Sequence, residues 1–188
     1  MAHVLVITGP SGVGKGTLIR LLRERRRSIR LSISATTRSP RLGEEDGVDY
    51  HFLKDDQFDR LVADGAFVEH ARYAGERYGT LRSELEGRPD EPQLIVLEIE
   101  LQGARQVRLA LPDALQVFIA PPSFETLRER LVGRGTDSPQ TVSKRLAVAH
   151  EELEAQGEFA EVIVNDRLGD AVVQLELLVD RLIGGAVD

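Results

Sequence analysis

Residues 9–17, Gly-Pro-Ser-Gly-Val-Gly-Lys-Gly-Thr, constrain the fold of this chain more than any other segment. They follow an apolar, β-branched run at residues 4–8, which is typical of a strand buried on both faces. They precede residues 15–27, an amphipathic helical pattern with its leucines on one face. Glycines let the backbone curl until successive N–H groups point at phosphate oxygens, and the helix start adds its dipole. The segment therefore predicts a phosphate-binding loop between a strand and a helix.

The end of this loop departs from the strict pattern. Lys15 supplies the mobile positive charge expected at the β- and γ-phosphates. The next residue is usually a Ser or Thr that binds Mg²⁺, but here Gly16 follows, and Thr17 comes one place later. We interpret this as a variant with Mg²⁺ near Gly16 and Thr17, which leaves open which hydroxyl lies near the metal. The alternative is a glycine-rich turn that binds no ligand.

Strands and helices alternate along most of the chain. Further strands are expected at 31–35, 94–99, 115–120 and 162–164. Further helices are expected at 102–110, 123–132, 139–156 and 170–183. This alternation predicts an α/β fold with a doubly wound parallel sheet and helices on both faces. Residues 34–83 interrupt it as a small insert with strands at 48–53, 67–73 and 77–80 and a helix at 55–64.

Composition narrows the class of protein. Of the 188 residues, 41% are hydrophobic, which is enough for a real core. The net charge of −7 argues against a dedicated nucleic-acid binder, and the absence of Cys rules out disulfides and thiolate metal sites. The chain begins without the pattern of a signal peptide, and its apolar runs are too short to cross a bilayer. We therefore expect a soluble, cytoplasmic protein with no membrane partner.

Arginines away from ordinary helix faces are candidates for binding phosphate. Arg38 and Arg41 lie on a loop that Pro40 holds extended, so two guanidiniums can converge on one phosphate. A solvated pair of loop charges is the alternative. Arg134 lies between two glycines, and Arg145 lies on the helix expected at 139–156. A lid that carries arginine to a transferring phosphate is a common solution, and an exposed helix face is the alternative for Arg145.

The chain resembles the guanylate kinase family over almost its whole length. The matching segments are GPSGVGKGT at 9–17, SATTRSPRLGEEDGVDYHF at 34–52, FVEHARYAGERYGT at 67–80, VLEIELQGARQVR at 96–108, FIAPPS at 118–123, RLVGRGTD at 130–137 and VIVND at 162–166. Residues 36–50 are the most specific part, because glycine-rich loops occur in many folds. The resemblance implies a P-loop NTPase-type sheet with a GMP-binding insert and a lid. It divides the chain into core at 1–33, GMP-binding subdomain at 34–83, core at 84–124, lid at 125–155 and core at 156–188.

The resemblance also implies roles for individual residues. The guanine contacts would be Ser34, Glu69 and Thr80. The clamp on the GMP phosphate would be Arg38, Arg41, Tyr50 and Tyr78, with Glu44 positioning Arg41 or contacting the clamp. Catalytic charge would come from Lys15, Arg38, Arg134 and Arg145. ATP would contact Gly9, Pro10, Ser11, Gly12, Val13, Gly14, Lys15, Gly16, Thr17, Asn165 and Asp166.

The role of Glu69 has a physical rationale, and the acidic pair of the family appears here in altered form. A Glu69 carboxylate accepts from both N1–H and the 2-amino group of guanine, whereas adenine would leave it unpaired at a cost of ~1–3 kcal/mol. The family's acidic Asp-x-Asp pair is here Glu98 and Glu100, which the period of a strand places on one face. These two glutamates would lie near the GMP and the water shell of Mg²⁺, with Glu98 reaching the metal through water. A pair of salt-bridge partners at the sheet edge is the alternative.

The resulting hypothesis is a guanylate kinase that transfers the γ-phosphate of ATP directly to GMP, and to dGMP, with Mg²⁺, in purine nucleotide metabolism. ATP and GMP are the expected partners, and the sequence leaves open whether the protein is a monomer or a homo-oligomer. One rival is a kinase for another small phosphorylated acceptor, such as AMP or CMP. The other rival is a catalytically silent scaffold of the same fold that binds peptides. Tyr73 is assigned to packing.

Overall fold

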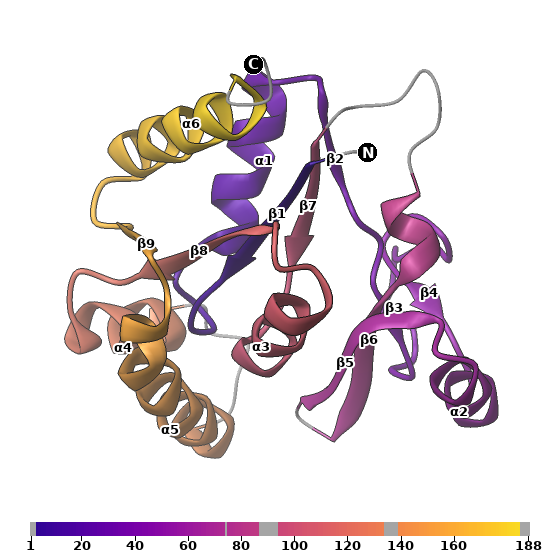
Figure 1. The fold of residues 1–188 in the computed structure, drawn as a ribbon. Coiled ribbons are helices and arrows are strands. Elements are labelled where there is room, and N and C mark those ends of the chain that lie inside the picture. Colours follow the sequence, from indigo (N-terminus) through magenta and orange to yellow (C-terminus); the bar gives the residue numbers. More distant parts are fainter. Residues whose placement is uncertain (1–2, 74, 87–93, 134–138, 185–188) are drawn as a thin grey trace.

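Five parallel strands form the central sheet of the protein. The computed structural model describes residues 3–73, 75–86, 94–133 and 139–184. The sheet has the order β2-β7-β1-β8-β9, and Figure 1 shows it edge on in the middle of the molecule. Its strands are β1 (His3–Thr8), β2 (Ile29–Leu31), β7 (Leu94–Glu98), β8 (Leu115–Ala120) and β9 (Glu161–Val164). All four pairings are parallel, which confirms the predicted α/β class.

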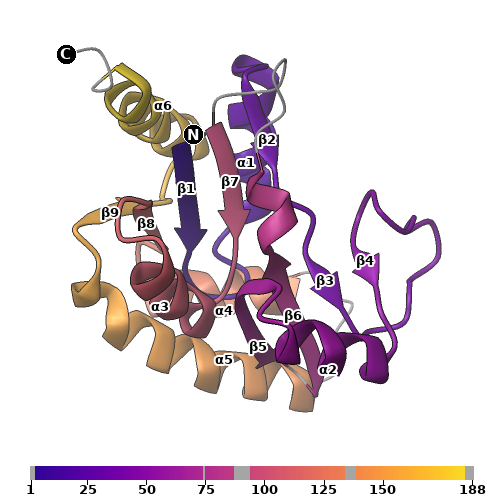
Figure 2. The ribbon, with the colours of Figure 1, turned by 45° about the vertical axis from the view of Figure 1, so that its right-hand side comes forward.

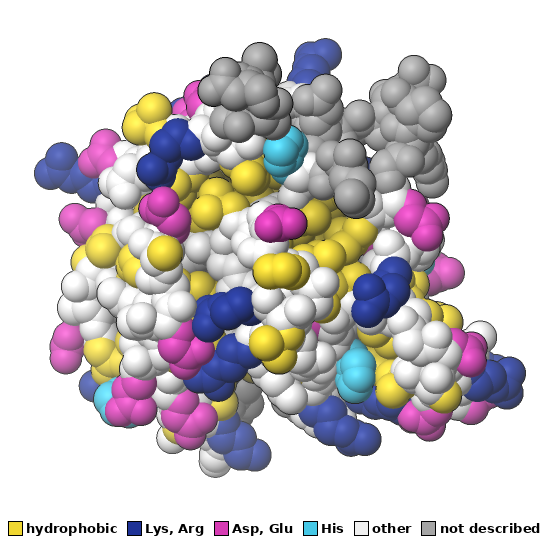
Figure 3. All heavy atoms as spheres, viewed as in Figure 1, with side chains coloured by type: hydrophobic (Ala, Val, Ile, Leu, Met, Phe, Trp, Pro, Cys, Tyr) yellow, Lys and Arg dark blue, Asp and Glu magenta, His cyan; other side chains and the backbone are white. Residues whose placement is uncertain are grey.

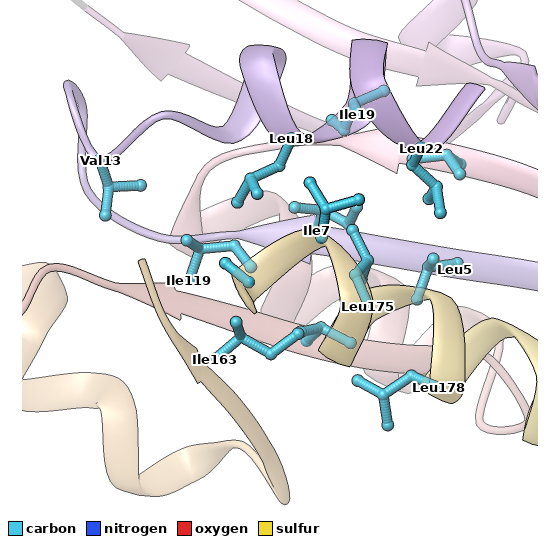
Figure 4. Close-up of a cluster of buried hydrophobic side chains, with 14 of the residues drawn as sticks. Leu5, Ile7, Val13, Leu18, Ile19, Leu22, Ile119, Ile163, Leu175 and Leu178 are labelled. Atoms are coloured by element: carbon cyan, nitrogen blue, oxygen red, sulfur yellow. The ribbon is translucent and has the colours of Figure 1, made fainter. Parts of the chain in front are cut away.

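Helices cover both faces of this sheet. On one face, α1 (Lys15–Arg25) and α6 (Leu168–Gly184) pack against Ile7, Ile119 and Ile163, as Figure 4 shows. On the other face, α3 (Leu101–Ala110) packs Ala104 and Val107 against the opposite sides of β1 and β7. Strands buried on both sides explain why their sequences read as continuous apolar runs rather than alternating ones.

The insert forms a second, smaller sheet of order β4-β3-β6-β5. Its elements are β3 (Ala35–Thr36), β4 (His51–Phe52), α2 (Asp55–Ala63), β5 (Phe67–Tyr73), β6 (Glu76–Leu81) and the 3-10 turn η1 (Arg82–Leu85). Figure 2 shows this sheet beside the core, joined to it where the chain runs from β2 into β3.

Two expected strands were wrong in their bounds. Residues 31–35 are not one strand, because the core ladder stops after the Ser32 N–H bonds to the Val96 carbonyl, and the chain then enters the other sheet at Ala35. Residues 48–53 contain only the short β4, since the Gly47 N–H bonds to the Tyr50 carbonyl and closes a turn before it. Local alternation does not reveal such a change of sheet.

Two helices lie beyond β8, at the bottom of Figure 1. They are α4 (Phe124–Gly133) and α5 (Pro139–Glu154), which runs into the 3-10 turn η2 (Ala155–Glu158). Leu127, Leu131 and Ala149 of these helices join the core cluster below α1. Among the described helices, none has the length and apolar character needed to cross a membrane. On the face shown in Figure 3, acidic and basic side chains are interspersed around exposed apolar ones.

The register of β1 with β7 positions the functional site. Ile7 pairs with Glu98, so the ends of both strands lie at the same edge of the sheet. The loop at residues 9–14 and the start of α3 therefore emerge side by side. In open α/β sheets, ligands bind in the crevice outside these carboxyl ends.

The insert has its own small core, and this gives a first prediction. Phe58 is fully buried and stacks on Phe67 with ring centroids 4.5 Å apart, while the Arg77 guanidinium lies 4.2 Å above its ring. Phe58→Ala should destabilise the insert by about 3–5 kcal/mol, because it leaves a cavity in a cluster of few residues. Hydrogen exchange should show faster exchange in β5 and β6 than in β1 and β8. Leu42→Ala, at an exposed position, is the control, and equal loss of protection in β1 would contradict a separate insert core.

Candidate functional site

The loop between β1 and α1 has the backbone of an anion-binding turn. Gly9 has φ of +137°, and a Cβ there would meet the Ile119 carbonyl oxygen at 2.2 Å. Gly14 has φ of +102° and caps the start of α1 in the left-handed region. A side chain at either position would therefore force the turn to move. We refer to residues 9–17 as the phosphate loop. Its turn is formed by four further predicted ATP contacts, Pro10, Ser11, Gly12 and Val13.

Lys15 is the first residue of α1 and folds back over this loop. Its side chain is buried, and its ammonium donates to the Gly9 carbonyl at 2.5 Å and to the Pro10 carbonyl at 3.4 Å. The Glu100 carboxylate lies 4.0 Å from the ammonium. The Lys15 ammonium is thus held over the phosphate loop by backbone carbonyl oxygens, which are weaker hydrogen-bond partners than a phosphate.

Asn165 supports the phosphate loop from below. Asn165 is buried, and its side-chain amide donates to the Val13 carbonyl at 2.8 Å. The backbone carbonyl of Asn165 accepts a hydrogen bond from the Arg130 guanidinium at 3.0 Å. The Asn165 side-chain amide is therefore engaged with the backbone of the phosphate loop. Asp166, the other residue predicted here, is exposed at the end of β9. Arg130 was missed, because a single arginine on a helix carries no distinctive signal.

A pocket of about 290 Å³ lies between the insert and the ends of β7 and α3, and it is lined by several of the predicted substrate residues. These are Ser34, Tyr50, Glu69, Tyr78, Glu98 and Glu100. Glu69 is buried on β5, and the Thr80 hydroxyl donates to its Oε1 at 2.7 Å. Burial raises the pKa of Glu69, and the Thr80 hydroxyl partly offsets this by stabilising the carboxylate. The pocket therefore presents the desolvated Glu69 carboxylate as a hydrogen-bond acceptor, with Oε1 held in place by the Thr80 hydroxyl.

Gly103 on α3 makes room for this carboxylate. A Cβ at Gly103 would meet Glu69 Oε2 at 2.5 Å, so any larger residue would displace the group. Gly103 is part of the pocket lining. Sequence reasoning missed it, although a glycine inside an expected helix is a signal of close packing.

Arg38 forms a charged cluster beside the two tyrosines. Its guanidinium lies 5.1 Å above the Tyr50 ring and donates to both oxygens of Glu44, each at 2.9 Å. These hydrogen bonds lower the pKa of Glu44, and Tyr78 also contacts Arg38. Glu44 accepts the Arg41 backbone N–H at 2.7 Å, so it positions Arg38 and the Arg41 backbone, while the Arg41 side chain is exposed.

Glu98 faces the start of α1. A Cβ on Gly16 would lie 3.7 Å from each of the two Glu98 carboxylate oxygens. Burial raises the pKa of Glu98, and the charge of Lys15 opposes that shift. Thr17 is exposed. Within the described ranges, no cluster of three or more acidic, His or Cys side chains forms a metal cage. A half-buried carboxylate beside the phosphate loop fits Mg²⁺, which takes few protein ligands and completes its shell with phosphate and water.

Arg145 lies on α5 and lines a second cavity, of about 990 Å³, between α3, β5 and α5. This cavity shares Ala71, Tyr73 and Glu100 with the first pocket, so the two adjoin. Arg134, the other predicted lid arginine, lies outside the described residues.

Tyr73 and Glu152 bring the insert and α5 to the phosphate loop, and sequence reasoning missed both contacts. The Tyr73 side chain contacts the Ser11 side chain, so it reaches the phosphate loop in addition to the packing role predicted for it. Glu152 is buried and contacts the Ser11 backbone N–H and the Glu100 carboxyl. Burial, with Glu100 next in importance, raises the pKa of Glu152 to about 8. Oε2 of each glutamate is buried without a hydrogen-bond donor, so one shared proton satisfies both.

Comparison with known proteins gives one consistent result. A model of the guanylate kinase family matches residues 1–182. The guanylate kinase of Synechococcus sp. (strain CC9902) is 54% identical over 179 residues, which cover 94% of this chain and 96% of the relative. That of Thermobifida fusca (strain YX) is 50% identical over 177 residues, covering 94% and 90%. The crystal structure of guanylate kinase from Anaplasma phagocytophilum aligns with a TM-score of 0.76 at 30% identity, covering 100% of this chain and 87% of that one.

The contact between Glu100 and Glu152 predicts a pH dependence of stability. Because the folded protein retains a proton that the unfolded chain releases near pH 4.5, stability should fall as pH rises from 4.5 to about 8. Glu152→Gln removes this titration, so the variant should gain stability relative to the wild type across that window, with a slope of order 1 kcal/mol per pH unit. Urea unfolding at several pH values, with EDTA present, measures the difference. Glu151→Gln is the exposed control, and a difference independent of pH would rule out the shared proton.

Proposed function

Because the chain belongs to the guanylate kinase family, whose members phosphorylate GMP with ATP, we propose that the pocket beside Glu69 holds GMP and the phosphate loop holds ATP. The chain is an ATP:GMP phosphotransferase. The assignment of individual residues to this reaction is the proposal. It rests above all on the buried Glu69 carboxylate, which Thr80 and Gly103 fix in place.

Guanine recognition follows from the chemistry of that carboxylate. Guanine offers two adjacent donors, N1–H and the 2-amino group, which match two carboxylate oxygens. Thr80 already occupies one lone pair of Oε1, so the group is held in a fixed orientation for the incoming base. Adenine lacks this donor pair and would leave a buried acceptor unpaired. Ser34, which also lines the pocket, supplies a further hydroxyl.

The phosphate of GMP is proposed to bind at the cluster of Arg38, Tyr50 and Tyr78, with Arg41. Glu44 holds the Arg38 guanidinium by two parallel hydrogen bonds, which fixes its plane and leaves its other edge for a phosphate oxygen. The exposed Arg41 side chain lies on the same loop and can close over the phosphate from outside. A bound phosphate would thus interact with the guanidinium charges of the arginines and with the phenolic hydroxyls of the two tyrosines.

Phosphoryl transfer requires positioning and charge rather than a covalent intermediate. Lys15 would leave the loop carbonyls for the ATP phosphates, and Arg145 would approach from α5 across the second cavity. Arg134 remains a predicted lid arginine. Mg²⁺, when bound, would offset the negative charge of the transferred group. Closing the insert and α5 around both nucleotides would exclude water, so that ATP is not hydrolysed before GMP is in place.

Several finer assignments remain predictions of the sequence. They are the use of dGMP, the requirement for Mg²⁺, a cytoplasmic location, and the division of the chain at residues 34, 84, 125 and 156. Asn165 supports the loop by its hydrogen bond to Val13, and Asp166 remains a predicted contact of the nucleotide.

Release of ADP in a coupled assay with Mg·ATP tests this proposal. The wild type should respond to GMP and not to AMP, CMP or UMP. Glu69→Gln should lower kcat/KM for GMP by roughly 10–200-fold, because an amide presents a donor where guanine needs an acceptor. Its kcat/KM for AMP should not fall in parallel. If the variant kept the wild-type preference for GMP over AMP, Glu69 would not be the guanine contact.

The close approach of α3 predicts a second, independent change in GMP binding. Gly103→Ala should push the Glu69 carboxylate away and raise KM for GMP, while an alanine inside a helix does not lower intrinsic helix stability. KM for ATP should change little. Gly169→Ala, in α6 with open space around its added methyl group, is the matched control. An unchanged KM for GMP in Gly103→Ala would show that the carboxylate can shift without loss.

A further inference from the structure

The 3-10 turn η1 carries a carboxylate that contacts both the entry to the insert and one of its strands. The side chain of Glu84 is 12% exposed and lies where the insert ends, before the chain returns to β7. Its Oε2 accepts a hydrogen bond from the Ile33 N–H at 2.9 Å, and its Oε1 lies 3.0 Å from Nε2 of His51 on β4. One carboxylate therefore joins the segment that enters the insert to the segment that leaves it.

Arg30 anchors this carboxylate to the core. Arg30 lies on β2 and pairs with Ile95 of β7. Its guanidinium donates to the Glu84 backbone carbonyl and, at 3.5 Å, to the Glu84 carboxylate. Figure 2 shows how the chain leaves β2 at this edge of the core sheet and continues into β3. Because β2 is held in the core sheet, these contacts fix Glu84 relative to the core.

The contacts of Glu84 enclose the backbone of Ser34, which lines the pocket of about 290 Å³. The residue before Ser34 is held by its N–H on Glu84, and the Ser34 carbonyl accepts the His51 N–H at 2.9 Å. The His51 imidazole then returns to Glu84. The contacts thus form a closed chain from Glu84 through Ile33, Ser34 and His51. Among the described residues that line the pocket, Glu84 itself is absent.

We propose that Glu84 is a positioning residue for guanine recognition, which holds the Ser34 hydroxyl in place for the base without touching GMP. The closed chain of contacts fixes the backbone from which the Ser34 side chain projects. The hydroxyl is then ordered before GMP arrives, so binding does not have to order it. The inference rests on the proposed binding of GMP in this pocket and on the proposed contact of Ser34 with guanine.

Steady-state kinetics of single variants test this positioning role. Glu84→Ala should raise KM for GMP roughly threefold to tenfold, which is the effect of losing about one hydrogen bond to the base. KM for ATP should change little, and kcat should change less than KM for GMP. Glu84→Gln should recover most of the loss, because its amide oxygen can accept the Ile33 N–H and its NH₂ can donate to His51. Glu86→Ala removes the same charge from an exposed position two residues away and is the matched control.

A double-mutant cycle shows whether Glu84 acts through Ser34. Ser34→Ala should raise KM for GMP by itself, and adding Glu84→Ala should then raise it little further, because the hydroxyl is already absent. Native-state hydrogen exchange gives a readout that needs no substrate. The Ile33 amide should exchange faster in Glu84→Ala, while the amides of β1 and β7 should keep their wild-type rates.

Urea unfolding checks that each variant is folded. Glu84→Asp keeps the charge but is one methylene shorter, so it should reach Ile33 and His51 less well and show the same effect in weaker form. It replaces Glu84→Ala in the cycle if that variant does not fold.

Four results would overturn the inference. Glu84→Ala could leave KM for GMP unchanged, it could raise KM for ATP equally, its effect could add fully to that of Ser34→Ala, or Glu86→Ala could have the same effect. A wild-type KM for GMP in Ser34→Ala would instead refute the proposed guanine contact of Ser34, and the inference would fall with it.

Discussion

The parallel pairing of β1 with β7 is the constraint on which the site depends. It sets Ile7 beside Glu98, so the phosphate loop and the two glutamates leave the sheet at the same edge. Because both strands are buried on both faces, sliding one past the other would place polar residues in the core. The rigid hydrophobic layers under α1 and α3 therefore hold Lys15, Glu98 and Glu100 in one small volume.

Much of the fold and part of the site could be read from the sequence because the signals are local. Apolar runs predicted the strands of the core sheet, and the glycine pattern predicted the phosphate loop. The break between β2 and β3 was missed because it reflects a change of sheet at Ser32, not a change of residue type. Tyr73 and Glu152 were missed for a related reason: each acts on Ser11 from an element distant in sequence. The role of Glu44 in holding Arg38 likewise depends on how its loop closes.

The pocket chemistry also bears on the two rival functions. A scaffold that binds peptides has no use for a buried lysine folded over a phosphate loop or for an arginine held in plane by Glu44. A kinase for an adenine or cytosine nucleotide would leave Glu69 without the donors that its burial demands. Both rivals therefore require polar groups to be buried without benefit, whereas the proposed binding of guanine and ATP would use each of them.

Ser11 links parts of the molecule that are far apart in sequence. Its side chain contacts Tyr73 of the insert, and its backbone N–H contacts the carboxyl group of Glu152 on α5. The phosphate loop is thus contacted by a carboxyl group from its own chain. A nucleotide phosphate that uses this N–H must compete with Glu152, so ATP affinity and the docking of α5 are thermodynamically linked. Such linkage is reciprocal: bound ATP would weaken the contact of Glu152 with Ser11 by the same factor by which that contact weakens ATP binding.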